Sequence, residues 1–132
     1  MRIAELDISD EHGTLSIDST LEEAARILLQ MNRGVLILLD STKIPKGILT
    51  DSHLLKSMAN GLNPKDEKSS KHMDSNILLV NLDYFVSDII EDMKLKKPSA
   101  VVVVNSNAEL QGYFSPQDYS EALTRMGMKR KV

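Results

Sequence analysis

The 132 residues are enough for one compact domain or for two very small units that share a core, and the net charge of −3 disfavours broad binding to a phosphate backbone. The absence of cysteine excludes disulfides, thiolate catalysis and metal sites with cysteine ligands. Every apolar run is far shorter than the roughly 20 residues that cross a bilayer, and the first residues lack the apolar stretch of a signal peptide, so we expect a soluble, cytoplasmic protein.

The apolar pattern of the first half recurs in the second half without a gap. Sliding the segment 15–58 along the chain places Leu15 on Val80 and Gly47 on Gly112. Few letters are identical, but the shared pattern runs through four elements and indicates two copies of one unit. The chain is therefore divided into a first repeat, a linker and a second repeat at residues 1–58, 59–72 and 73–132.

In the first copy, an alternating strand at 15–17 precedes a helix whose apolar residues recur at the spacing of one helical face. Thr20 and Glu23 form a capping box that starts this helix. The run 35–39 is apolar on both faces, which is typical of a central strand buried on both sides, and turn-forming residues follow it. A third strand ends at Leu49, and a second helix comes next.

The second copy repeats this order after a linker of Gly, Pro, Ser and charged residues. It has a strand at 78–82, a helix, a β-branched strand at 100–104 and a third strand that ends at Phe114. A last helix begins near Pro116, where the missing N–H would be unpaired in any residue. The expected fold class is α+β, with two βαββα repeats packed through their sheets about a pseudo-two-fold axis.

Ser115 and Asp118 place a hydroxyl and a carboxylate side by side where the last strand turns into the last helix. A carboxylate can accept two hydrogen bonds from a vicinal diol such as that of ribose. The hydroxyl and the free backbone N–H groups of a helix start suit a phosphate or another ribose oxygen. Both residues could instead cap the helix, and the two roles are compatible.

These residues stand in an order that resembles a known family, the CBS domain (the regulatory domain of cystathionine β-synthase). Its repeat is strand, helix, strand, strand, helix, and it carries a glycine, two apolar residues, Ser or Thr, two variable residues and Asp. The second copy matches at Gly112, Ser115 and Asp118. The first copy has Thr50 but carries His53 in place of the aspartate.

The resemblance implies a regulatory module that binds an adenosine-containing ligand (AMP, ADP, ATP or S-adenosylmethionine) in a cleft between the repeats. Asp118 would hold the ribose, and Ser115 would contact the ribose or the phosphate. The adenine would lie in an apolar slot formed by Ile77, Leu78, Pro98, Ala100 and Val101. Three cationic residues are candidates for the phosphate, namely Arg33, Lys96 and Lys97.

The first-copy site, where Thr50 is the counterpart of Ser115, is in question. His53 offers one hydrogen bond per ring nitrogen and cannot grip a diol as a carboxylate does. Thr50 and the two residues after it are explained equally well as a helix cap. We therefore expect one competent nucleotide site per chain, which is built on Asp118.

The second helix of each copy is apolar enough to be more than one-sided. This could mean burial in the core, or a homodimer interface, which CBS pairs commonly form through their helices. We favour the dimer, although the sequence does not give its orientation. The residues concerned are Leu54, Leu55, Met58, Tyr119, Leu123 and Met126.

No nucleophile–base pair, glycine-rich phosphate loop or metal-ligand spacing is found in the sequence, so we expect neither an enzyme nor a required cofactor or metal. Nucleic-acid and membrane partners are not expected, and a regulatory output would pass through an unknown protein partner. The alternative is a non-catalytic dimerisation or protein-interaction module with degenerate ligand sites, which the presence of His53 favours.

Overall fold

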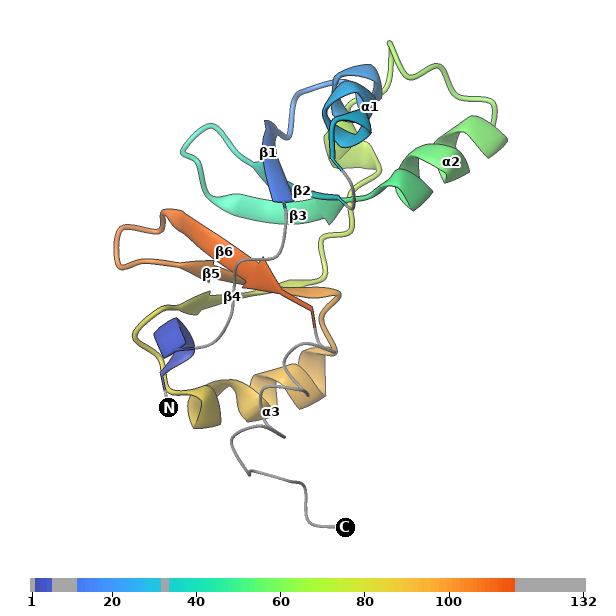
Figure 1. Cartoon of the computed structure of the whole chain (residues 1–132). Coiled ribbons are helices and arrows are strands. Elements are labelled where there is room, and N and C mark those ends of the chain that lie inside the picture. The colour runs from blue at the N-terminus through green and yellow to red at the C-terminus, as the bar shows by residue number, and fades with distance from the viewer. Residues whose placement is uncertain (1, 6–11, 32–33, 116–132) are drawn as a thin grey trace. The chain divides into compact units, whose positions relative to one another are not determined.

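The computed structural model describes residues 2–5, 12–31 and 34–115, and within this part the chain forms two three-stranded sheets and three α-helices (Figure 1). The α+β fold class is therefore confirmed. Contacts divide the chain into two compact units. One unit spans residues 11–77, and the other combines residues 78–132 with residues 1–10.

The first unit has the predicted order strand, helix, strand, strand, helix. Its elements are β1 (His12–Ser16), α1 (Leu21–Leu29), β2 (Val35–Leu39), β3 (Pro45–Leu49) and α2 (Asp51–Ala59). β2 is the central strand, which is parallel to β1 and antiparallel to β3. The middle residues of β2, Leu36 to Leu38, are completely buried, which confirms that this strand is covered on both faces.

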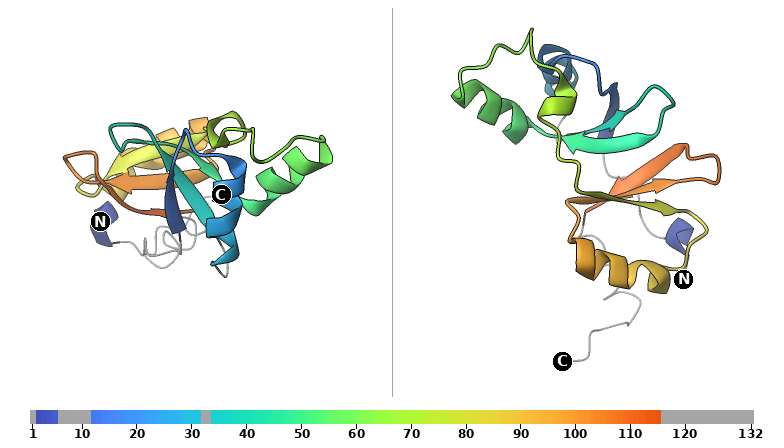
Figure 2. Two further views of the ribbon diagram at one scale, coloured as in Figure 1. Left: turned by 90° about the horizontal axis from the view of Figure 1, so that it is seen from above. Right: turned by 180° about the vertical axis from the view of Figure 1, so that it is seen from behind.

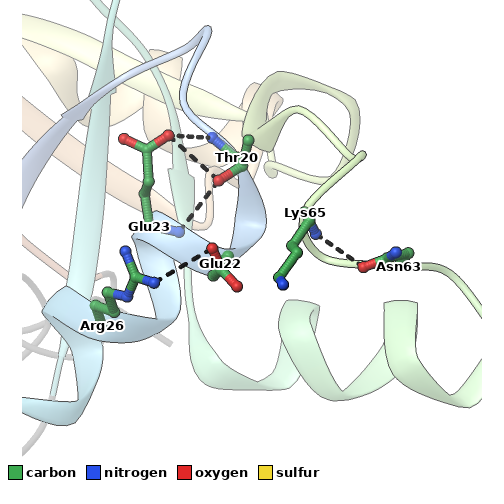
Figure 3. A network of polar contacts seen from close by, with 6 residues as sticks. All are labelled: Thr20, Glu22, Glu23, Arg26, Asn63 and Lys65. Carbon is green, nitrogen blue, oxygen red and sulfur yellow. Dashed lines mark hydrogen bonds and ion pairs between the residues drawn. The ribbon is translucent and has the colours of Figure 1, made fainter.

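The helix α1 begins where the sequence predicts, at a capping box. The Thr20 hydroxyl accepts a hydrogen bond from the backbone N–H of Glu23 at 3.2 Å, and the Glu23 carboxylate accepts from the backbone N–H of Thr20 at 3.3 Å (Figure 3). Two otherwise unpaired N–H groups of the first turn are thereby satisfied. The apolar side of α1, with Leu21 and Ala24 fully buried, packs in a core with Leu36 of β2.

The second unit contains the second sheet, whose strand order is β4-β5-β6. Its elements are η1 (Ile3–Glu5, a 3-10 helix), β4 (Ile77–Asn81), α3 (Val86–Lys96), β5 (Ala100–Val104) and β6 (Leu110–Phe114). The helix α3 lies along one face of this sheet, as the opposite views in Figures 1 and 2 both show. The N-cap of α3 is Phe85, whose side chain cannot accept a hydrogen bond, and the Asp88 carboxylate accepts one from the Phe85 N–H at 3.3 Å.

The two hairpin turns, which protrude from their sheets in Figure 2, have equivalent hydrogen bonds in the two units. In the turn after β2, Oδ1 of Asp40 accepts from the N–H groups of Thr42 and Ile44 at 2.8 and 3.0 Å. In the turn after β5, Oδ1 of Asn105 accepts from the equivalent two N–H groups at 2.9 and 3.0 Å. The third residue after each has a left-handed backbone, with φ of 69° and 63°. Two different sequences therefore build one turn.

A second likeness between the units could not be seen in the apolar pattern, because it involves residues far apart in the chain. The backbone N–H of Ile3 donates to the carbonyl oxygen of Tyr84 at 2.8 Å, and Ile3 is completely buried in the core under α3. In the first unit, the N–H of Ser69 donates to the carbonyl oxygen of Ser19 at 2.7 Å, at the same point before the first helix. Ser69 starts the 3-10 helix η2 (Ser69–Lys71).

The packing units therefore differ from the predicted sequence boundaries at two places. Residues 2–5 were assigned to the first repeat, but they pack on the second unit. The predicted linker 59–72 contains η2, and its Ser69 is a buried residue of the first unit. The division into two repeats remains a prediction about sequence units, and each short 3-10 helix is held by main-chain bonds to the loop between the first strand and the first helix of its unit.

Candidate functional site

The first copy of the motif lies at the end of β3, where Thr50 is the N-cap of α2. The backbone N–H of Thr50 donates to Nδ1 of His53 at 2.9 Å, and the Thr50 hydroxyl lies 2.9 Å from the hydroxyl of Ser52. Since a backbone N–H can only donate, Nδ1 of His53 accepts, and the neutral ring carries its proton on Nε2. Thr50 thus makes the local contacts expected of a helix cap.

The glycine of this motif has a structural reason. Gly47 lies in β3 beside the segment that leads to β4, and Ile48 exchanges backbone hydrogen bonds with Asp74 at 2.9 and 2.8 Å. A Cβ at Gly47 would meet the sulfur of Met73 at 2.7 Å and the carbonyl oxygen of Asp74 at 2.8 Å. Only glycine lets this segment run so close to β3.

The second copy of the motif is described up to Ser115. This residue follows β6 directly and is half-buried, at the position that Thr50 takes after β3. Val102 pairs with Tyr113 as Ile37 pairs with Ile48, so the two hairpins share one register. Asp118 lies outside the described residues, and its assignment to the ribose stays a prediction.

The five residues predicted to contact the adenine are described, and the four that belong to strands fall into two pairs. The side chains of Leu78 and Val101 pack in the core of the second unit, where Val101 is completely buried and Leu78 is partly buried. Ile77 and Ala100 begin their strands one residue earlier and therefore belong to the opposite face of the sheet, with exposed fractions of 7% and 1%. Pro98 is buried just before β5.

Two of the three residues predicted to contact the phosphate are described. Arg33 lies outside the described residues. Lys96 ends α3, and Lys97 is its C-cap with a left-handed φ of 47°, so both lie at the approach to β5. This left-handed residue ends the helix and turns the chain toward Pro98.

A pocket of about 360 Å³ opens beside His53, and it is lined entirely by the first unit. One wall is a single face of α2, and the other is the segment before β4. Its lining residues are His53, Lys56, Ser57, Asn60, Lys71, His72, Met73 and Asp74. The sequence analysis does not predict this pocket. The spacing of three, four and seven residues from His53 along α2 was the available signal.

An apolar groove of about 370 Å³ lies on another side of α2, between α2 and α1. Leu55 and Met58 border it and are 65% and 61% exposed, whereas Leu54 packs against the core. Of the six residues predicted at a dimer interface, Tyr119, Leu123 and Met126 lie outside the described residues. The described three therefore separate into one core residue and two exposed ones.

Across residues 2–5, 12–31 and 34–115, no group of three or more acidic or histidine side chains is arranged to hold a metal ion. In the same ranges, no helix has the length and apolar character that a membrane span requires.

Comparison with known proteins finds a family match in the first half of the chain. The family model of the CBS domain matches residues 4–60. A curated relative, an uncharacterised 17.7 kDa protein of Acidianus ambivalens, is 29% identical over 104 residues, which are 79% of this chain. The match spans 62% of that relative's length.

The similar solved structures are CBS-domain proteins. The protein PAE2072 of Pyrobaculum aerophilum, complexed with AMP, is 25% identical, with 98% of this chain and 100% of that chain covered and a TM-score of 0.73. The CBS domain pair of protein MJ0100, complexed with 5′-methylthioadenosine and S-adenosyl-L-methionine, is 22% identical, with 98% of each chain covered and a TM-score of 0.69. The protein TA0289 of Thermoplasma acidophilum is 20% identical, with 97% and 72% covered and a TM-score of 0.70.

Proposed function

We propose that this pair of CBS domains is a regulatory module that binds an adenosine-containing ligand at the motif that ends its second repeat. The observation that carries the proposal is the likeness to the AMP complex of the Pyrobaculum protein, which extends over nearly the whole of both chains. The MJ0100 pair supports it, because its two ligands also contain adenosine. The ligand class is therefore AMP, ADP, ATP or S-adenosylmethionine.

In this proposal the two copies of the motif have different roles. Ser115 supplies a hydroxyl directly after β6, and Asp118 supplies the carboxylate that accepts from both hydroxyls of a ribose. The backbone groups at Ile77 and Ala100, at the starts of neighbouring strands β4 and β5, can read the edge of the adenine. The first copy has His53 in place of the carboxylate. Nδ1 of His53 already accepts from the Thr50 N–H, so the ring has no acceptor left for a ribose.

The module acts by binding and not by turnover. A bound ligand shifts a conformational equilibrium only by its differential affinity for the two states, so the output is a change in the surface offered to a partner protein. A second copy of the chain is the partner that the exposed Leu55 and Met58 favour, because the apolar groove beside them would be covered in a homodimer.

A second candidate function is a dimerising or protein-interaction module whose ligand sites are degenerate. The specific observation in its favour is His53, because one of the two motif copies has lost its carboxylate. Under this alternative, Ser115 and Asp118 cap the last helix and adenosine compounds do not bind.

Thermal unfolding in the presence of AMP, ADP, ATP and S-adenosylmethionine separates the two candidates. A ligand at 100 times its dissociation constant stabilises the folded state by about 2.7 kcal/mol. We expect at least one compound to raise the melting temperature of the parent and to leave Asp118→Ala unchanged. Lys46→Gln is the control from the first repeat, because its ammonium lies 3.8 Å from the Asp40 carboxylate, and it should respond like the parent. No shift with any of the four compounds would leave the interaction module as the function.

A further inference from the structure

We propose that the pocket between α2 and the segment before β4 is a binding site for a phosphate group, separate from the adenosine site. All eight lining residues belong to the first unit, so this proposal does not rest on the proposed function. Its volume of about 360 Å³ lies at the lower end of the range for small-molecule sites. The ligand is therefore a free phosphate or pyrophosphate ion, or the phosphate end of a small metabolite.

The charges of the pocket favour an anion. Lys56 comes from α2 and Lys71 from η2, and within the described part of the chain neither ammonium group has an acidic partner. The carboxylate in the lining is that of Asp74, whose Oδ1 accepts from the N–H of Asn76 at 2.9 Å. Two cations thus stand against one lining carboxylate that is turned to its own backbone, and the nearby Glu67 carboxylate is engaged by the His72 ring.

The neutral donors are also oriented. Because Nδ1 of His53 accepts from the Thr50 N–H, the proton on Nε2 remains available to a ligand oxygen. The ring of His72 is held by the Glu67 carboxylate, which accepts from Nε2 at 2.8 Å, so the neutral ring adds no further donor for a ligand. Asn60 adds a side-chain amide one turn beyond Lys56. A phosphate group can accept from several such donors at once, and a ligand with a single acceptor cannot.

Two further lining residues contribute shape and no donor. The Ser57 hydroxyl is 2% exposed and donates to the carbonyl oxygen of Leu54 at 2.7 Å, so its proton is already used. Met73 is held against Gly47, where a Cβ would meet its sulfur at 2.7 Å. These contacts fix the two walls, so the donors are positioned before a ligand arrives.

Titration with pyrophosphate tests the site, with the ring resonances of His53 and His72 followed by NMR. We expect both resonances to move in a saturable way in the full chain. Lys56→Gln and Lys71→Gln should each raise the dissociation constant about tenfold, the factor that about 1.4 kcal/mol produces. Lys46→Gln is the matched control, because Lys46 lies in the same unit but its ammonium is 3.8 Å from the Asp40 carboxylate. This control should bind like the parent.

Further titrations identify the source of the phosphate and distinguish this site from the adenosine site. Adenosine should leave both ring resonances in place. AMP that competes with pyrophosphate would show that the site takes the phosphate of a nucleotide, and inorganic phosphate that competes while AMP does not would show that it takes the free ion. Asp118→Ala should leave the pyrophosphate titration unchanged even where it abolishes adenosine-ligand binding. Non-saturable shifts, or an equal loss in all three lysine variants, would overturn the proposal in favour of diffuse charge attraction.

Discussion

The backbone N–H of Thr50 donates a hydrogen bond to Nδ1 of His53 across 2.9 Å, at the point where β3 gives way to α2. In the second repeat, the residues at these two positions are Ser115 and Asp118. An imidazole can close the helix start as a carboxylate would, but it has no second acceptor for a diol once Nδ1 is used. One contact therefore stabilises the helix and distinguishes the two repeats chemically.

The first prediction reverses this difference. His53→Asp restores the full motif in the first repeat, because an aspartate at this third helical position can accept from the Thr50 N–H and still offer an oxygen to a ribose. We expect calorimetry to detect an additional adenosine-ligand binding event in this variant. His53→Asn, which replaces the carboxylate by an amide of similar shape, is the control and should bind like the parent. An unchanged titration of His53→Asp would show that the carboxylate alone does not make the site.

The second prediction concerns the glycine of the motif. Gly47→Ala forces a Cβ against the carbonyl oxygen of Asp74 at 2.8 Å, and a backbone atom cannot move aside as a side-chain end can. We expect a loss of about 1–3 kcal/mol in the free energy of unfolding, measured with urea. Gly61→Ala has no atom within 4 Å and suffers only from its φ of 78°, so it should cost less, about 1 kcal/mol. The reverse order of the two variants would contradict the close approach.

The third prediction tests the packing of the N-terminal 3-10 helix. Ile3 is completely buried in the core with Val86 and Phe114, so Ile3→Ala should lower the free energy of unfolding by about 2–5 kcal/mol. Leu95 of α3 is 81% exposed and provides a control in the same unit. Leu95→Ala should change the stability by no more than about 0.5 kcal/mol. Equal effects of the two substitutions would mean that Ile3 is not a core residue.

The burial of Ile3 and of Ser69 could not be predicted from the sequence. The Thr20 capping box and the two-face burial of β2 follow from residues close together in the chain, and both are confirmed. No local sequence pattern indicates the burial of Ile3 or Ser69, because the backbone N–H of each donates to a loop that is many residues away in the chain. The predicted strand at 15–17 begins earlier, at His12, because the parallel ladder with β2 extends to Val35 and needs no apolar alternation there.

The positions of the motif residues could be read from the sequence, but the surroundings of the motif could not. The match of Ser115 with Thr50 came directly from the spacing of the motif. The pocket beside His53 did not, because Lys71 and His72 belong to a segment that read as a linker. The backbone pairing of Asp74 with Ile48 brings that segment onto α2, and apolar periodicity carries no information on such a pairing.

The fourth prediction uses the turn that the two repeats share. The Thr42 hydroxyl, which donates to Oδ1 at 2.7 Å, and the Ile44 N–H lower the pKa of Asp40 below its usual value of 3.8. A carboxyl whose pKa is depressed by folding stabilises the folded state above the unfolded pKa, and this contribution is lost as the pH falls through the folded pKa. An NMR titration of Asp40 should therefore find its midpoint below pH 3.8.

A natural control exists for this turn, because the second repeat has Asn105 at the same position. Oδ1 of Asn105 accepts from the two equivalent backbone N–H groups. Asp40→Asn should consequently keep the turn while removing the acid-dependent part of its contribution. Urea midpoints measured at pH 7 and pH 3 should differ less in this variant than in the parent. A parent-like difference would assign the acid dependence to other carboxyl groups.

The most direct test of the central claim is isothermal titration of the protein with AMP, for the parent and for Asp118→Asn. We predict saturable binding in the parent. The amide variant should bind at least tenfold more weakly, because an amide offers one acceptor oxygen to the ribose diol where the carboxylate offers two. Parallel titrations with S-adenosylmethionine, ADP and ATP identify the preferred ligand. Binding of equal strength in parent and variant would contradict the assignment to Asp118, and an absence of binding by all four compounds would contradict the sensor itself.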